Sequence, residues 1–260
     1  MKRMARFLCA SLALALAVPA GAQTYPSQPI RMIAPFPPGG SVDITARLIA
    51  EPLAGQLGTR IIIDNRSGAS GNIGMEAAAR AKPDGYTVVL NTIPLVTNQS
   101  LFDKLTWDPI RDFAPIGMVA TSPHVLVIAS KVPASKVEDL VRLARANPGK
   151  LSYASAGVGT TFHFCGEMFK DSTNTFILHV PYRGGGPALL DTLAGQVDLS
   201  FSDTVGGAAA RQGGNVARAG GDRRKAIRAA ARCADPAGSR REGLSVHAVA
   251  RAARPSGHAA

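Results

Sequence analysis

The sequence predicts a mixed α/β fold in which two lobes each contain a mostly parallel sheet covered by helices. Two observations predict this class. Short runs rich in branched apolar residues alternate with stretches of helical periodicity from residue 30 to residue 201, which is the pattern of strands joined by crossover helices. The alternation restarts near Ala120–Pro123, after the prolines at 94, 109 and 115. The restart predicts a first lobe at 23–122 and a second lobe at 123–205.

The first lobe is expected to hold three strands: Ile30–Ala34, Arg60–Asp64 and Thr87–Leu90. Between them we expect one helix from Asp43 that ends at Gly58, with Pro52 as a point of irregularity, and another over Gly71–Ala81. The buried face of the first helix is expected to carry the apolar residues that recur at helical spacing: Ile44, Leu48, Leu53 and Leu57. The stretch 93–118 predicts no long element because its prolines interrupt it.

The second lobe is expected to hold the strands His124–Ala129, Leu151–Ala154, Phe176–Val180 and Val197–Phe201. Three helices are expected in this lobe. One begins after Ser135, and the other two span Thr161–Lys170 and Gly186–Ala194. Ser135 and Glu138 have the spacing of a capping box, in which the two side chains satisfy amides at the start of a helix. Asn147-Pro148-Gly149 then predicts the end of that helix.

Residues 1–22 have the three regions of a secretory signal peptide. Lys2, Arg3 and Arg6 precede an apolar run over Phe7–Val18, and Ala20-Gly21-Ala22 supplies small residues for cleavage after Ala22. The run is shorter than the roughly 20 residues that cross a bilayer. We therefore expect an exported, periplasmic protein with this segment removed. Of the three cysteines, Cys165 is expected to pack as a buried apolar residue, because no disulfide or zinc spacing is present.

The formal charge of +11 is confined to the two ends of the chain. The last 55 residues, 206–260, contain ten Arg and one Lys against three acidic residues, and the signal segment contributes +3. The body is neutral by this count, which argues against a nucleic-acid partner. The tail also contains 17 Ala and 9 Gly. Such a composition buries little apolar surface, so a disordered tail is expected.

Three glycine-rich junctions between strands and helices are the candidates for ligand binding: 35–41, 155–161 and 181–186. Ligands of parallel sheets bind beyond the carboxyl ends of strands. Glycines permit close backbone approach, and helix amino termini favour anions. These junctions therefore suit a carboxylate, although each one alone could simply connect a strand to a helix.

Motifs of other chemistries are absent from the sequence. It has no phosphate-binding P-loop, no complete dinucleotide fingerprint after Gly157-x-Gly159, and no nucleophile elbow. Its five histidines show no metal-ligand spacing, so neither a metal nor a cofactor is expected. His163 could contact a ligand or simply pack in its helix. Asp43 could contact a ligand or satisfy helix amides.

At these junctions the chain resembles a known family. The segments YPSQPIRMIAPFPPGGSVDITARLIAEPLAGQLGTRIIIDNRSGASGNIGMEAAARAKPDGYTVVL (25–90), NPGKLSYASAGVGTTFHFCGEMFK (147–170) and VPYRGGGPALLDTLAGQVDLSFSD (180–203) resemble, in this order, the Bug-type receptors of tripartite tricarboxylate transporters. The resemblance implies a two-lobed type II periplasmic-binding fold. It also implies a non-enzymatic, monomeric receptor that captures a small organic acid, such as a di- or tricarboxylate, and delivers it to membrane permease subunits.

The resemblance further implies that the loops at Pro38–Asp43 and Ser155–Thr161 hold the carboxylate. The expected ligand-binding residues are Pro38, Gly39, Gly40, Ser41, Asp43, Ser155, Gly157, Gly159, Thr160, Thr161, His163 and Asp203. In this family a helix, a strand and a long return into the first lobe follow the position of Val205. Here the composition changes at that point, which predicts a frameshift near 205–207 and a second lobe and return segment that are incomplete.

Three other interpretations remain open. A frameshifted chain could be a non-functional remnant of a receptor. The tail could instead be a genuine basic segment for nucleic acid or a membrane. Ser41 or His163 could serve an exported hydrolase, although no activated nucleophile with a base and an orienting group is evident at readable spacing.

Overall fold

The computed structural model describes residues 24–203 and 243–251. Its strands are β1 (Ile30–Ala34), β2 (Ile61–Asn65), β3 (Thr87–Asn91), β4 (Phe113–Ile128), β5 (Ser152–Ser155), β6 (Leu178–Pro181), β7 (Leu199–Asp203) and β8 (Gly243–Arg251). Its helices are α2 (Ser41–Leu57), α3 (Asn72–Ala79), α4 (Pro94–Leu101), α5 (Val137–Ala146), α6 (Thr161–Thr173) and α7 (Gly185–Leu193), with a short 3₁₀ turn, η1, at Ala69–Gly71. The mixed α/β class is confirmed.

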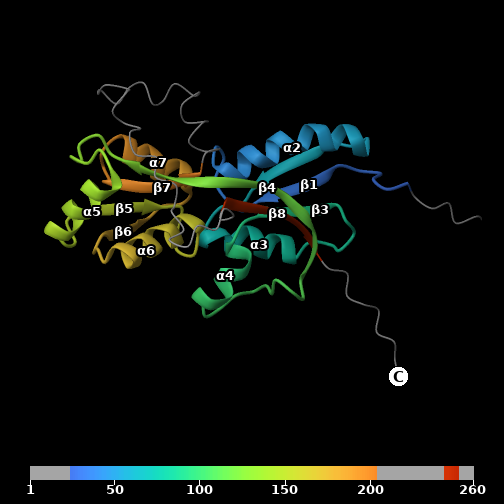
Figure 1. Cartoon of the computed structure of the whole chain (residues 1–260). Helices are drawn as coiled ribbons and strands as arrows, with labels where there is room; N and C mark the ends of the chain where they lie inside the picture. Colours follow the sequence, from blue (N-terminus) through green and yellow to red (C-terminus); the bar gives the residue numbers. More distant parts are fainter. Residues whose placement is uncertain (1–23, 204–242, 252–260) are drawn as a thin grey trace, which may run out of the picture.

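One sheet runs through both lobes in the order β2-β1-β3-β8-β4-β7-β5-β6. β1, β2 and β3 pair in parallel in the first lobe, and β5, β6 and β7 do so in the second. β8 and β4 lie between these groups and pair antiparallel with their neighbours. Figure 1 shows the two lobes side by side, joined by these two strands. The glycine-rich junctions follow the carboxyl ends of β1, β5 and β6.

β4 belongs to both lobes. Residues from Phe113 to Pro123 pair with β8, and residues from His124 to Ile128 pair with β7. The change of partner lies next to the expected lobe boundary at 122/123. β4 is longer than the strand expected at His124–Ala129, because the proline-containing sequence before it also adopts extended backbone with register shifts. α4 was likewise not expected; it begins at Pro94, where a proline is tolerated in the first turn.

The tail contributes a strand that the sequence analysis did not anticipate. β8 pairs with β3 on one side and with β4 on the other, so it fills the centre of the sheet. The expectation of a wholly disordered 206–260 is therefore wrong for 243–251. Residues 204–242 and 252–260, like the predicted signal peptide, lie outside the described residues.

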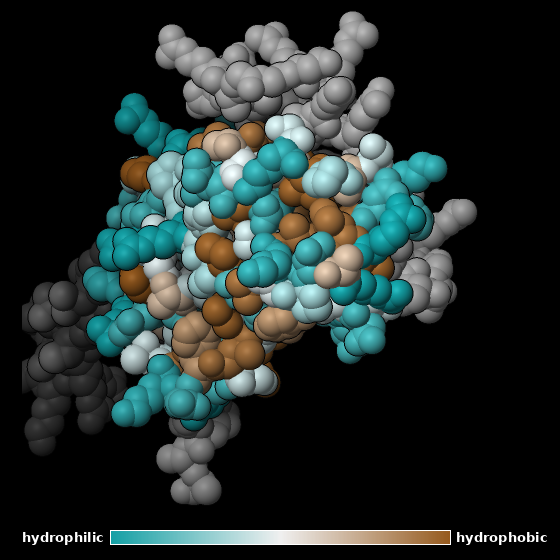
Figure 2. All heavy atoms as spheres, turned by 90° about the vertical axis from the view of Figure 1, so that its left-hand side faces the viewer, coloured by the Kyte–Doolittle hydropathy of each residue, from teal (hydrophilic) through white to brown (hydrophobic). Residues whose placement is uncertain are grey.

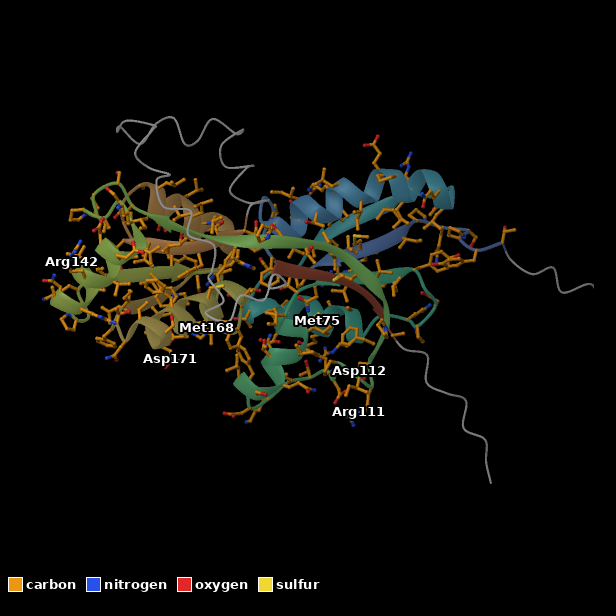
Figure 3. All side chains as sticks on the ribbon, viewed as in Figure 1. Met75, Arg111, Asp112, Arg142, Met168 and Asp171 are labelled. Atoms are coloured by element: carbon orange, nitrogen blue, oxygen red, sulfur yellow. The ribbon has the colours of Figure 1, made fainter. Side chains whose placement is uncertain are left out.

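Helices cover both faces of the sheet in each lobe (Figure 1). In the first lobe, Met32 and Leu90 pack under α2, whereas the adjacent Ile33 and Val89 pack with Met75 of α3 on the opposite face. Figure 3 shows Met75 within this lobe. In the second lobe, α5 and α6 enclose the larger core around Tyr153 and α7 covers the other face. This alternation follows from the two-residue period of strands.

Two local expectations are corrected by the structure. Leu48 lies outward on α2, with 68% of its surface exposed, and the buried apolar side of the first turns is formed by Val42 and Ala46. The capping box at α5 does not form. The Ser135 amide donates to Asp139 Oδ2 (3.2 Å). The residue before the helix is Lys136, and its side chain makes no capping hydrogen bond. Asp139 thus accepts the amide hydrogen that the Glu138 carboxylate would accept in a capping box.

The described surface is mixed in character. Figure 2 views the second-lobe end, where hydrophobic side chains reach the surface between hydrophilic ones. Among the described helices, none is long and apolar enough to cross a membrane. No cluster of three His, Cys, Asp or Glu that could hold a metal ion occurs within 24–203 or 243–251. Cys165 is buried in the second-lobe core.

Candidate functional site

Three helices begin at one small cavity between the lobes. The cavity measures about 30 Å³ and is lined by Phe36, Gly40, Ser41, Val42, Thr92, Ala156, Thr160, Thr161, Phe162 and Gly185. Gly40 and Ser41 start α2, Thr160 and Thr161 start α6, and Gly185 starts α7. The first lobe thus supplies one helix amino terminus, and the second lobe supplies two.

The amides of these helix starts are available to a ligand. None of the three preceding residues, Gly40, Thr160 and Gly184, makes a side-chain cap. The Thr160 hydroxyl instead donates to Gly157 O at 2.6 Å. Amides of a first helical turn have no partner within the helix, and the helix dipole places partial positive charge there. Their convergence therefore favours an anion.

Apolar side chains surround these donors. Phe36, Val42 and Phe162 are buried and line the small cavity. Among the residues that line it, none has a charged side chain. Hydrogen bonds to an anion are stronger in such surroundings than in water. The cavity can therefore hold one acidic group by amides and by the hydroxyls of Ser41 and Thr161.

A second cavity of about 380 Å³ adjoins the first and shares Phe36 and Ala156 with it. Both lobes line it: the first lobe contributes Gly68–Gly71 and Leu101, and the second contributes Gly157, Tyr182 and Arg183, among others. Arg183 is exposed and is the charged residue in this lining. The two cavities together provide a short path from the helix amino termini to a guanidinium group.

The lobes touch each other beside this path. The Thr97 hydroxyl of α4 donates to Gly159 O at 3.0 Å. Gly157 faces Ser70 so closely that an added Cβ would lie 3.0 Å from its Oγ, and a Cβ on Gly184 would lie 2.7 Å from Pro37 Cδ. These glycines therefore permit the approach of the two lobes as well as the turns themselves.

The loop 155–161 is fixed by its own side chains. The Gly157 amide donates to Ser155 Oγ at 3.1 Å, and Gly157 O accepts from Thr160. Gly157 and Gly159 have φ of +123° and +79°, which other residues rarely adopt. Ser155 and Gly159 therefore shape the loop, and Gly157, Thr160 and Thr161 reach the cavities.

Asp43 fixes the other expected loop. Its carboxylate accepts from the Gly39 amide (2.9 Å), Asn65 Nδ2 (2.9 Å) and Arg47 Nε (3.1 Å). Burial raises the pKa of Asp43, but the hydrogen bonds from Arg47, Gly39 and Asn65 outweigh it and hold the pKa below its usual value. Asp43 lines neither cavity, and the backbone amide that it accepts from, that of Gly39, precedes α2 rather than lying in its first turn.

The other expected residues lie around the cavities rather than in their walls. Pro38 and Gly39 belong to the turn before α2. Asp203 is buried at the end of β7, paired in register with His124 of β4. Burial lowers the pKa of His124, and the charge of Asp203 opposes that shift. His163 is turned toward the loop backbone, where its Nδ1 accepts from the Gly159 amide at 3.3 Å.

Some lining residues were not among the expected ligand-binding residues. Thr92 follows β3 directly, so its position after a strand was the available signal, and Phe36 belongs to the glycine-rich junction 35–41. Gly185 and Arg183 belong to the third glycine-rich junction, which the residue pattern did identify. Tyr182 lies in the same junction and donates to Asp191 Oδ2 at 2.8 Å, which raises the pKa of Tyr182 to about 12 together with its burial.

Comparison with protein families gives one match that covers most of the chain. The model described as "Tripartite tricarboxylate transporter family receptor" matches residues 45–231. A UPF0065 protein from the tcbD-tcbE intergenic region of Pseudomonas sp. strain P51 is 40% identical over 181 residues, covering 70% of this chain and 54% of that protein. Protein BugT of Bordetella pertussis is 39% identical over 184 residues, covering 70% and 56%. The chain thus spans about half the length of these relatives.

Solved structures give the same fold. The periplasmic binding protein BugD has a TM-score of 0.77 at 30% identity, and the match covers 89% of this chain and 79% of that one. An R. palustris protein with adipate has a TM-score of 0.76 at 28% identity with the same coverage. MatC from Rhodopseudomonas palustris with bound malate has a TM-score of 0.72 at 25% identity, covering 87% and 79%. The expected two-lobed periplasmic-binding fold is therefore confirmed.

Proposed function

This chain belongs to the family of tripartite tricarboxylate transporter receptors, and we propose that it is a periplasmic receptor for a small organic acid with two carboxylate groups. The family is one of solute-binding receptors, in agreement with a protein that binds without catalysis. The observation that carries the proposal is the convergence of the α2, α6 and α7 amino termini on one cavity between the lobes. Backbone amides in this arrangement suit a carboxylate.

The rest of the ligand would occupy the larger cavity. A chain of a few carbons that starts at the small cavity would pass Phe36 and Ala156, which line both cavities. A second carboxylate would then lie within the cavity that contains Arg183, whose guanidinium is the natural partner of that group. Adipate and malate, with which the two R. palustris proteins were solved, are acids of this kind.

The remaining parts of the proposal concern the cell. We propose that residues 1–22 direct export and are removed after Ala22, and that the loaded receptor, a monomer, delivers its acid to membrane permease subunits. No cofactor and no nucleic acid take part in this scheme. Support comes from the charge pattern and the signal-like sequence of the first 22 residues, and from membership of the receptor family.

Calorimetry and thermal melting of the purified full chain test the binding proposal. Adipate and malate should each raise the melting temperature and give saturable heat, since a ligand that binds only the folded state stabilises it. Hexane-1,6-diol, which has the carbon chain of adipate without its charges, should do neither. A folded protein that responds to neither acid, or that responds equally to the diol, would overturn the proposal.

A further inference from the structure

Two histidines from different elements support the loop 155–161 from behind. His163 of α6 accepts the Gly159 amide hydrogen at its Nδ1 (3.3 Å). His179 of β6 has its Nε2 2.7 Å from Ser155 Oγ, and this same Oγ accepts the Gly157 amide hydrogen (3.1 Å). Gly159 thus contacts an imidazole ring directly, and Gly157 is linked to one through Ser155 Oγ, which also lies 3.3 Å from Gly157 O.

The two rings form part of one stack. The centroids of His163 and His179 are 4.4 Å apart with 33° between the planes. The ring of His179 stacks on Tyr153 with 4.8 Å between centroids and 22° between planes. Tyr153 is almost completely buried in the core of the second lobe. The rings therefore have little freedom to turn away from the loop.

Charged groups face the pair from α6. Glu167 Oε1 lies 4.0 Å from His163 Nε2, and it also accepts from Tyr153 Oη at 2.6 Å and from Lys170 Nζ at 2.9 Å. Burial lowers the pKa of His163, opposed by Glu167 and assisted by Lys170. Burial and then the adjacent His163 lower the pKa of His179 to about 4. Met168 and Asp171, labelled on α6 in Figure 3, belong to its exposed side.

We propose that His163 and His179 are positioning residues of the ligand-binding loop, and that His163 holds it in its binding shape only while the His163 ring is neutral. A protonated imidazole carries hydrogen on both nitrogens. His163 Nδ1 could then no longer accept from the Gly159 amide, and two donors would face each other. A positive charge on one ring would also oppose a charge on the other, 4.4 Å away.

The inference rests on the proposed function, because the loop 155–161 is taken to contact the acid. Proton linkage fixes the direction of the pH effect on the loop. The folded state lowers the histidine pKa values, so the neutral rings stabilise the loop fully above about pH 6.5. That stabilisation is lost as pH falls from there toward the folded-state value, which is about 4 for His179. The receptor would therefore hold its ligand less tightly in acidic surroundings.

Two substitutions at position 163 separate positioning from simple packing. In His163→Asn, the side-chain oxygen stands near the place of Nδ1 and can accept the Gly159 hydrogen without titrating. In His163→Leu, the volume is retained and the acceptor is lost. His179→Gln likewise places a polar group near Ser155 Oγ that does not titrate. A ring that only fills space predicts the same pH response for the asparagine variant as for the unchanged chain.

Amide exchange measured by NMR on the full chain without ligand gives the first readout. Protection of the Gly159 amide should fall between pH 7.5 and 4.5 in the unchanged chain, by up to about tenfold, the size of one lost hydrogen bond. It should stay level in His163→Asn and be low throughout in His163→Leu. The ring nitrogens of His163 should report a non-protonated Nδ1 at pH 7.5. An equal fall in the asparagine variant, or a protonated Nδ1 at pH 7.5, would overturn the inference.

Calorimetry with adipate gives the second readout. At a given pH, adipate is protonated to the same extent with either protein. The ratio of the dissociation constants of the unchanged chain and His163→Asn therefore reports the effect of the His163 ring alone. This ratio should rise from pH 7.5 to 4.5, by up to about tenfold, and a constant ratio would count against the inference. Absence of adipate binding in both proteins at pH 7.5 would instead refute the proposed ligand, and the exchange data would still decide the role of the histidines.

Discussion

Replacing Gly159 by alanine tests whether contact between the lobes is needed for binding. An added Cβ would lie 2.7 Å from Leu101 Cδ1 and 3.0 Å from Asn98 Oδ1, both on α4 of the opposite lobe. Gly159 also has φ of +79°. Gly195 is a matched control, because its φ is +78° and the nearest side chain, Lys131, would be 3.6 Å from the new Cβ. The two alanine variants thus share the backbone strain and differ in the clash.

The magnitudes follow from these two terms. Alanine in the left-handed region costs about 1–2 kcal/mol at either position. The clash at Gly159 costs about 1–3 kcal/mol more, as overpacking does, but only while the lobes are in contact. If ligand binding requires that contact, this second cost is subtracted from binding and raises the dissociation constant roughly 5- to 150-fold.

Urea unfolding and calorimetry with adipate provide the assay. Gly195→Ala should lose stability and bind adipate as the unchanged chain does. Gly159→Ala should show a similar loss of stability together with weakened binding. Equal adipate affinity in the two variants would show that the contact between Gly159 and α4 is unimportant for binding, and would refute the reasoning.

Three further changes give separate predictions. Asp43→Ala should lower the free energy of unfolding by about 1–3 kcal/mol, because it leaves the Gly39 and Asn65 donors without an acceptor. Since the pKa of Asp43 is lowered, this difference in stability should be full at pH 7 and shrink below about pH 4 in urea titrations. A difference that stays constant with pH would contradict this. Arg183→Gln should weaken adipate binding roughly 3- to 10-fold while leaving that of hexanoate, which lacks the second carboxylate, unchanged; equal losses in calorimetry would dissociate Arg183 from the distal group. Val249→Pro should lower stability by about 3 kcal/mol or more, because it removes a ladder hydrogen bond from a central strand; an unchanged melting temperature would show that β8 contributes nothing to the folded sheet.

Local patterns were sufficient to predict most of the fold. The strands at 30–34 and 87–91 carry compact apolar runs, the strand at 199–203 alternates apolar and polar residues, and α2, α6 and α7 begin after glycine-rich turns. Which side of a helix is buried was harder to predict from the sequence. In α2 the apolar residues are distributed around the helix, so the spacing that contains Leu48 was as plausible as the one that contains Val42 and Ala46.

β8 was not predicted, because the Ala-, Arg- and Gly-rich composition of 206–260 argued against folded structure more strongly than the local alternation argued for a strand. Its sequence, GLSVHAVAR, alternates in the way a strand can, with valines at 246 and 249. The surrounding Ala, Arg and Gly content suggested that nothing in 206–260 could fold. A short strand inserted between two existing strands is stabilised mainly by backbone pairing with its neighbours, and that pairing depends on distant parts of the chain. A frameshift near 205–207 stays a prediction.

The site was predictable only in outline. Glycine-rich turns after strands indicated where a ligand could lie, and Gly40, Ser41, Thr160 and Thr161 do line the small cavity. The role of His179 could not be foreseen, because its partner Ser155 is reached through the pairing of β5 with β6. Nor could the sequence distinguish residues that shape a loop, such as Asp43 and Ser155, from those that face a cavity.

The position of β8 has a consequence for the order in which the chain folds. The second-lobe sheet pairs strands that are near in sequence, such as β5 with β6, where Ser152 meets Leu178. The first-lobe sheet is completed only when Val88 of β3 meets Ala250 of β8. Contacts between distant residues form slowly because a long loop must close. Synthesis of the chain therefore leaves one edge of β3 and one edge of β4 unpaired until residues 243–251 are made, and these edges are exposed to aggregation in the meantime.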